Sequence, residues 1–379
     1  MYASFFSLGF RPFFFLCALV GLFNPLIWML NYSEVIDLKT IFSSNTAWHG
    51  FEMLFAYGQF LITGFLLTAS SHWADRPPIK NTPLLILFLI GLFERFIPYL
   101  NLSFSLSLFL FNLYGPLFLG YLISMLFKNR NQYIMTPIVF TFFLAKLLFL
   151  WGDLYAIEWA FETGKHLAVM SLILLIVIFS GRIMPMFCQR YYGFRPAIPK
   201  KADLLTIISI LLLFIPKDTL PIPVEALFLA FAFIMGVIRL YYWQFKRSFS
   251  FPLLGILHMG QAFLCLSFAL NFLALFTEEV SYAMAPLHAY TVGSFGLFSL
   301  GMILRVSKGH SGRELTCDKT DKVIIHSAYL CAFLRFLPFL TGQYLLTPLL
   351  ITASLFWTLC FFLYLKKYIP ILTSPPMRS

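Results

Sequence analysis

The sequence predicts an all-α, polytopic membrane protein, a bundle of about twelve transmembrane helices. Of its 379 residues, 60% are hydrophobic and 11% are charged, whereas soluble proteins carry about 25% charged residues. Runs of about 20 apolar residues, long enough to cross the hydrocarbon core as helices, recur along the whole chain. A soluble globular fold is therefore excluded, and membrane lipid is an expected partner.

Twelve such runs follow one another in order. Their approximate limits are 10–30, 48–71, 83–100, 103–127, 133–153, 164–187, 202–216, 222–243, 251–276, 285–305, 323–340 and 345–365. The seventh run is the shortest, and Pro216 bounds it. An even number of spans places both termini on the same side of the membrane.

The distribution of Lys and Arg predicts that this side is the cytoplasm. Nineteen Lys and Arg residues, from Arg11 to Arg378, fall in segments that this topology places inside, against three outside, Lys39, Lys165 and Lys217. The outer loops instead collect Asp and Glu. The net charge of +11 then reflects topology and lipid contact, and no nucleic-acid partner is expected.

We interpret residues 1–379 as a single integral-membrane domain whose first helix is retained. Gly9-Phe10-Arg11-Pro12 recurs as residues 193–196, which raises a possible six-plus-six pseudo-repeat of residues 1–190 and 191–379. Four-residue matches also arise by chance in a chain this apolar. The six cysteines show no CxxC spacing, so we expect no disulfide framework.

Histidines are the clearest candidates for metal ligands. In the predicted topology His49, His166 and His288 begin three descending helices at the outer surface, while His258 lies deeper. Imidazole is the usual protein ligand of haem iron and a good ligand for copper. The alternative is three separate interfacial histidines, because no sequence pattern shows that their helices touch.

The helix predicted from His288 onward has a second notable feature. At 100° per residue, Gly293 and Gly296 lie together beside the histidine face. Such a flat strip would let another helix or a cofactor ring approach closely.

A polar stripe is predicted on the second helix. Glu52, Gln59 and Thr63 fall on one flank below His49 and could carry protons or water toward a metal, or hold helices together. Arg95, near the outer end of the third helix, is placed either to bind a haem propionate or to pair with an acid such as Glu52.

Three segments together resemble the NnrS family of bacterial membrane proteins of the nitric oxide response. They are GFRPFF at 9–14, WHGFEMLFAYGQFLITGFLLTA at 48–69 and LHAYTVGSFGLFSLGMILRVSKGHSGR at 287–313; GRIMPMF at 181–187 and LLGILHMG at 253–260 resemble further family segments. The resemblance implies metal-ligating roles for His49, His258, His288 and His310, and also for His166. It departs at Leu150, near which the family often has a histidine, and at Gln261, where it often has a tyrosine.

The resemblance implies haem b, with copper as a second candidate metal, in the bacterial inner membrane. The expected function is an oxidoreductase that reduces nitric oxide to N2O, with electrons from a quinol or a small redox protein. Two alternatives stay open: an NO-binding sensor or scavenger without turnover, and a small-molecule transporter.

Overall fold

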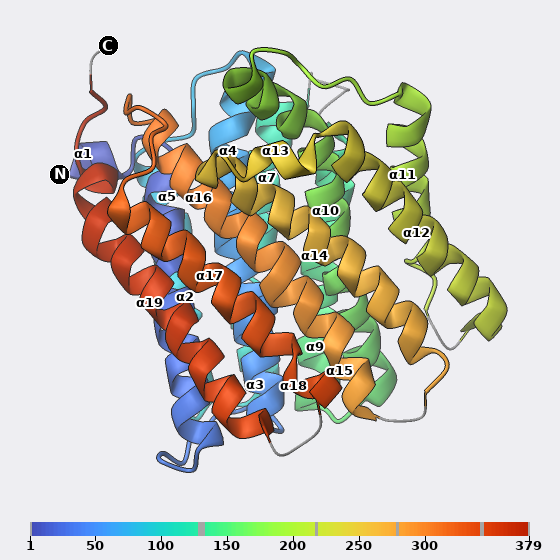
Figure 1. Ribbon diagram of the computed structural model, residues 1–379. Coiled ribbons are helices and arrows are strands. Elements are labelled where there is room, and N and C mark those ends of the chain that lie inside the picture. Colours follow the sequence, from blue (N-terminus) through green and yellow to red (C-terminus); the bar gives the residue numbers. More distant parts are fainter. Residues whose placement is uncertain (1, 128–132, 217–218, 278–279, 342–344, 378–379) are drawn as a thin grey trace. The chain divides into compact units, whose positions relative to one another are not determined.

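The computed structural model describes residues 2–127, 133–216, 219–277, 280–341 and 345–377 (Figure 1). These residues form helices joined by turns and loops, and no strand occurs among them. The all-α prediction is confirmed. Within this part of the chain, ten helical segments are long and apolar enough to cross a membrane.

The ten segments match ten of the twelve predicted spans. They are Phe10–Tyr32, Asn45–Ala74, Thr82–Tyr99, Phe104–Leu126, Met135–Leu154, Glu158–Tyr192, Ile222–Tyr242, Pro252–Ala274, Met284–Gly309 and Leu346–Thr373. The other two predicted spans correspond to α11 (Lys200–Leu212), which is only 13 residues long, and α17 (Lys319–Phe336), which carries three charged residues in its first turn. The total number of spans and the cytoplasmic termini stay predictions.

The chain divides into two compact units. Unit 1 comprises residues 1–171, 306–314 and 361–379, and unit 2 comprises residues 172–305 and 315–360. Unit 1 thus recruits two segments from the C-terminal part of the chain. The predicted pseudo-repeat of 1–190 and 191–379 is not tested by this division and stays a prediction.

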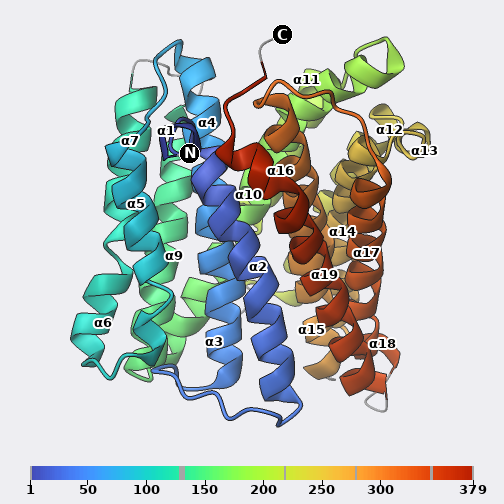
Figure 2. The ribbon, with the colours of Figure 1, turned by 90° about the vertical axis from the view of Figure 1, so that its left-hand side faces the viewer.

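Aromatic side chains and glycines fill the core of unit 1. Here α2 (Phe10–Tyr32) packs on α4 (Tyr57–Ala74), α4 on α7 (Tyr114–Leu126), and α7 on both α5 (Thr82–Phe93) and α9 (Met135–Leu154), as Figure 2 shows. Gly64 of α4 lies against Phe14, and Gly91 of α5 against Phe60 and Tyr114, where a Cβ atom would clash. Small residues therefore let these helices approach closely.

Unit 2 is built around α14 (Pro252–Ala274). This helix contacts α12 (Ile222–Tyr242), α15 (Val280–His288), the following π-helix η4 (Ala289–Gly296) and α17 (Figure 1). The contacts bring together segments that follow one another in the sequence. An arrangement of neighbouring antiparallel helices explains them.

Two membrane segments contain π-helical turns. The first begins three residues after His49, where α3 (Asn45–Phe51) runs into η1 (Glu52–Ala56); the second, η4, begins directly after His288. Such turns are rare and often occur at functional sites. Because they change the angle between successive residues, a constant 100° spacing does not describe the residues after His288.

The predicted flat glycine strip is wrong for this reason. Gly293 faces the ring of Phe263 on α14, whereas Gly296 faces the indole of Trp357 on α19 (Leu346–Thr373). The two glycines therefore accommodate different neighbouring helices and do not form one surface.

The repeated tetrapeptide has different surroundings in its two copies. Gly9 is the N-cap of α2 with a φ of −54° and lies against Leu67, whereas Gly193 has a φ of +79° and open space around it. In the first copy, Arg11 is fully buried and its Nη1 donates to the carbonyls of Ile371 and Leu372 in the last turn of α19. The negative end of the α19 helix dipole thus stabilises this guanidinium.

Candidate functional site: a buried ionic network and the histidines around it

A network of charged and amide side chains lies inside unit 1. Glu52 comes from η1, Gln59 from α4, Glu94 and Arg95 from the turn after α5, and Lys146 from α9. Glu94, Gln59 and Lys146 are fully buried, and Glu52 is 3% exposed. We call these residues, together with Asn24 of α2, the ionic network.

Hydrogen bonds connect the members without a break. Arg95 Nη1 donates to Oε1 and Oε2 of Glu52 at 2.9 and 2.8 Å, and its Nη2 donates to Glu94 at 3.2 Å. Lys146 Nζ lies 3.1 Å from both carboxylate oxygens of Glu94 and 2.9 Å from Gln59 Oε1. Gln59 Nε2 donates to Glu94, and Asn24 Nδ2 to Glu52, both at 2.6 Å.

The network is balanced in charge. Two carboxylates, Glu52 and Glu94, face two cations, Arg95 and Lys146, so the formal charges sum to zero. Removing one partner of a buried ion pair costs about 3–5 kcal/mol, because the other charge is left without compensation. Each of the four charges is therefore needed for the other three to stay buried.

The predicted polar stripe is divided by the structure. Glu52 and Gln59 belong to the network and are joined through Arg95 and Glu94. Thr63 stands apart, where it accepts a hydrogen bond of 2.9 Å from the Tyr114 hydroxyl. Of the two roles expected for Arg95, the structure contains the pairing with Glu52; binding of a haem propionate is a further role that it does not test.

His49 lies one helical turn before Glu52, whose backbone N–H donates to the His49 carbonyl. Its ring stacks on Trp28 of α2, with centroids 4.4 Å apart and planes 21° apart. The N-cap of its helix is Ser44, whose hydroxyl accepts from the Ala47 N–H. A fixed helix start and a stacked indole thus hold this imidazole in place.

His288 is 8% exposed and lies in unit 2. Its Nδ1 lies 2.9 Å from the Met284 carbonyl, and its ring stacks on Phe339 at 5.0 Å. A carbonyl can only accept, so Nδ1 carries a proton, and in the neutral imidazole the lone pair is then on Nε2. Metal-binding histidines commonly show this arrangement, so His288 has the chemistry of an axial ligand.

His258 has a different arrangement. Its Nδ1 lies 3.1 Å from the Leu254 carbonyl and its Nε2 lies 3.0 Å from the Trp243 carbonyl. A carbonyl oxygen faces each ring nitrogen, so in this conformation neither nitrogen is open to a metal. The predicted role of His258 as a ligand would require the ring to turn.

The two remaining predicted ligands lie in unit 1. His166 is half-buried on α10 (Glu158–Tyr192). His310 follows α16 (Leu297–Gly309), and its ring lies 5.3 Å from that of His72 and 5.9 Å from that of Phe10. Burial, and secondarily the neighbouring His72, lowers the pKa of His310 below its ordinary value of 6.5.

These histidines do not form a cluster in the described part of the chain. Nowhere in that part do three or more His, Cys, Asp or Glu side chains gather in a way that could hold a metal ion. The donor set therefore does not fit a copper centre made of such ligands, and copper stays a prediction. Haem iron needs only one or two axial imidazoles, so the single imidazoles of His49 and His288 fit haem.

Sequence reasoning missed the fourth charge of the network and a buried cation in unit 2. Lys146 is the only charged residue in the apolar stretch TPIVFTFFLAKLLFLWG at 136–152, and a lone charge in a membrane span itself indicates a buried partner or a function.

In unit 2, Arg305 of α16 is 3% exposed and stacks on the Phe187 ring at 3.7 Å. A cation–π contact contributes about 0.5–2 kcal/mol, less than the several kcal/mol that burying an ion costs.

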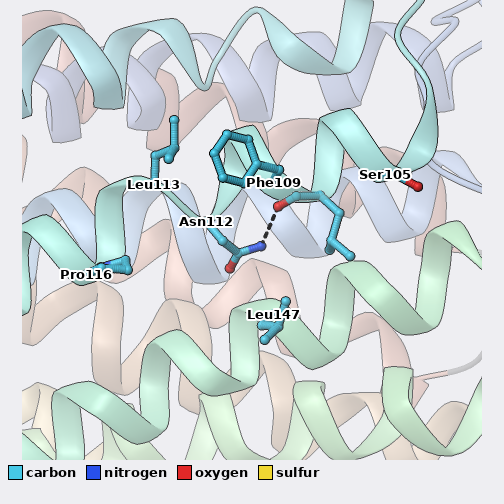
Figure 3. A pocket seen from close by; sticks show the side chains of 7 residues that line it. Ser105, Phe109, Asn112, Leu113, Pro116 and Leu147 are labelled. Atoms are coloured by element: carbon cyan, nitrogen blue, oxygen red, sulfur yellow. Dashed lines mark hydrogen bonds between the residues drawn. The ribbon is translucent and has the colours of Figure 1, made fainter.

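The surface cavity in Figure 3 lies elsewhere in unit 1 and contains none of the predicted site residues. It measures about 430 Å³ and is lined by Phe109, Leu113 and Leu147, together with Ser105, Leu108, Asn112 and Pro116. Asn112 lines this hollow, and its amide nitrogen donates to the Leu108 carbonyl at 2.7 Å (Figure 3). Exposed apolar side chains on membrane spans contact lipid, so we assign this hollow to the lipid-facing surface.

Comparison with known proteins supports the resemblance of the three motif segments. The family model described as NnrS protein matches residues 4–375, nearly the whole chain, whereas a comparison with curated proteins finds no match. Membership of this family suggests that this multi-pass membrane protein takes part in the nitric oxide response. The motifs, the order of the helices and the extent of the match agree, and the chain belongs to the NnrS family.

Proposed function

We propose that this protein binds nitric oxide in the bacterial inner membrane and reduces it to N2O. One observation carries the proposal: a buried carboxylate, Glu52, lies one helical turn from a candidate haem ligand, His49, within a hydrogen-bonded network that reaches Lys146. Family membership supplies the connection to nitric oxide. A protein that only sensed NO would need the imidazole but not a titratable chain.

The residues that would hold haem b are His49 in unit 1 and His288 in unit 2, each through an imidazole nitrogen. When bound, haem would supply a ferrous iron, which binds NO. Arg95 remains a candidate for a propionate, since guanidinium groups recognise carboxylates. Membrane spans lined with phenylalanine suit a small ligand that prefers apolar surroundings.

The chemistry requires protons as well as electrons. Two NO, two protons and two electrons give one N2O and one water. We propose that Glu52 Oε1 holds a proton on its way to the site, while Asn24 and Arg95 orient the carboxylate. Gln59 would extend this path toward Lys146, and Thr63, bonded to Tyr114, is assigned a secondary place in it. The electrons would come from a quinol or a small redox protein.

The first test of this proposal is spectroscopic. His49→Ala and His288→Ala should each remove or alter the Soret band of the purified protein. His326→Ala is the control, because His326 is exposed and its Nδ1 is bonded to the Lys322 carbonyl. Unchanged Soret bands in both ligand variants would contradict the haem assignment.

The second test separates a reductase from a sensor. Glu52→Gln keeps the shape of the side chain but removes its titratable proton. Anaerobic NO consumption should therefore fall tenfold or more, since an acid–base group typically contributes about 10²–10⁴-fold. Thr136→Val is a matched control, because Thr136 is buried on α9 of unit 1 and its hydroxyl has no hydrogen-bond partner among the described residues. NO consumption that persists in Glu52→Gln with haem bound would rule out Glu52 as the relay, and a haem-loaded wild type without turnover would favour a sensor or scavenger.

A further inference from the structure

Arg305 is a buried cation in unit 2 that lacks an acidic partner among the described residues. Its Nη1 donates to the Tyr191 hydroxyl at 3.3 Å, but its Nε and Nη2 have no hydrogen-bond partner. Its guanidinium face is covered by Phe187, and Tyr191 lies 5.5 Å away. The guanidinium thus has two unused donors in a region shielded from water.

Two other buried arginines have acidic partners, and a third, Arg11, donates its Nη1 to backbone carbonyls at the end of α19. Arg95 pairs with Glu52 and Glu94, and Arg239 pairs with Asp203 and donates to the Val177 carbonyl at 2.7 Å. Arginine stays charged in proteins, so Arg305 cannot escape the cost of burial by losing its proton. A missing anion would account for its position.

The geometry of the unused donors indicates which anion. Nε and Nη2 form one edge of the guanidinium, the edge that binds two oxygens on a single atom side by side. Arg190 is exposed beside Tyr191 and opposes the charge of Arg305, and Arg247 stacks on Tyr192 at 4.8 Å. Three cations at this end of unit 2 favour an anion that can carry more than one negative charge.

We propose that the Nε–Nη2 edge of Arg305 binds a phosphate-type oxyanion. The source is either the headgroup of an anionic lipid or free inorganic phosphate, since both present the same oxygens. Clusters of basic residues at membrane surfaces bind lipid headgroups in this way. Tyr191 is half-buried and Arg190 is exposed, so the site lies within reach of the surface. The proposal does not depend on haem or on nitric oxide.

The test uses the full chain in nanodiscs and measures its thermal unfolding midpoint. One series has phosphatidylcholine alone with increasing inorganic phosphate, at ionic strength held constant with chloride. A second series replaces part of the phosphatidylcholine with phosphatidylglycerol and contains no phosphate. We expect a saturable rise of the midpoint in at least one series, and the series that responds identifies the source.

Substitutions then locate the site. Arg305→Lys keeps the positive charge but loses the two-pronged edge, so the concentration of phosphate or the fraction of phosphatidylglycerol that gives half the rise should increase at least tenfold. Lys201→Gln removes an exposed charge of α11, elsewhere in unit 2, and should change it less than threefold. No rise in the wild type in either series would overturn the proposal, and so would an equal response in Arg305→Lys. The wild-type series decides even where a variant fails to fold.

Discussion

The pair Lys146–Glu94 gives the sharpest test of how the ionic network stabilises unit 1. Lys146 is fully buried, and its Nζ is 3.1 Å from both oxygens of Glu94. Lys146→Met leaves the network with a net charge of −1, and Glu94→Gln leaves it with a net charge of +1. The double substitution removes one charge of each sign and restores neutrality.

The expected magnitudes follow from this charge count. Each single substitution leaves a buried charge uncompensated and should lower the free energy of unfolding by about 3–5 kcal/mol. Replacing a whole buried ion pair is often neutral or even stabilising, so the double variant should be closer to the wild type than the sum of the two losses. We expect a coupling energy of at least about 3 kcal/mol, the upper end for contacting residues, and about 6 kcal/mol if the double variant loses no stability.

The assay is a double-mutant cycle in mixed detergent micelles, in which a denaturing detergent unfolds the protein and tryptophan fluorescence reports the transition. The control cycle uses the pair Lys165–Glu162 of α10, which is 2.6 Å apart but 38% and 53% exposed. An exposed pair of this kind should show a coupling below about 1 kcal/mol. The control thus separates burial from distance.

Additive losses would refute the reasoning. A coupling energy below about 0.5 kcal/mol for Lys146–Glu94 is the range of independent sites. It would mean that the two charges do not compensate each other in the folded protein. The assignment of Glu52 to a charge-balanced network would then fail as well, because Arg95 joins both carboxylates.

Three further outcomes are expected. Gly152→Ala should lower the unfolding midpoint, because the added Cβ would overlap with backbone of α10. Gly120→Ala, with open space around it, should leave the midpoint unchanged or raise it, because Ala has a higher helix propensity than Gly. The lowered pKa of His310 means that the unfolded chain binds more protons, so stability should fall as pH drops below about 6.5, and His310→Gln should reduce that fall in a pH series of midpoints. A reporter fused after Lys246 should read cytoplasmic, and one fused after Glu279, which lies outside the described residues, should read external; identical readings would contradict the predicted topology.

The positions of most membrane spans could be predicted because one property, the mean hydropathy of about 20 successive residues, determines them. A helix must present apolar side chains over the thickness of the bilayer, and the sequence shows that directly. The two predicted spans that fall outside the ten are α11 and α17, where the apolar run is short or interrupted by charges. Pro216 shortens the first, and Lys319, Asp321 and Lys322 make the second polar.

The ionic network was predictable only in part. The stripe of Glu52 and Gln59 is visible in the sequence because both residues lie on one segment, and pairing of Arg95 with Glu52 was one of two expected roles. The position of Lys146 was not, because its partner Glu94 is 52 residues away and depends on how α5 and α9 contact α7. Contacts between helices do not follow from the periodicity of any one of them.

The π-helical turns were the feature least accessible to sequence reasoning. A helical wheel assumes 100° per residue, but η1 and η4 interrupt this spacing next to His49 and His288. The assumption assigned Gly293 and Gly296 to one face, although they contact different helices. Deviations of this type depend on packing against neighbours, which a single segment does not reveal.

The charge balance of the network also constrains any relay through Glu52. In the resting arrangement Oε2 of Glu52 accepts from both Arg95 and Asn24, whereas Oε1 accepts from Arg95 alone, so a proton can be added to Oε1 without displacing a donor. Protonation would leave the network with one excess positive charge, held by Arg95 and Lys146. That excess favours release of the proton or arrival of an electron nearby, because either event restores neutrality in a buried region. Proton uptake by Glu52 would therefore be coupled to the arrival of an electron, which suits the proposed reduction of NO because that reaction consumes protons and electrons in equal numbers.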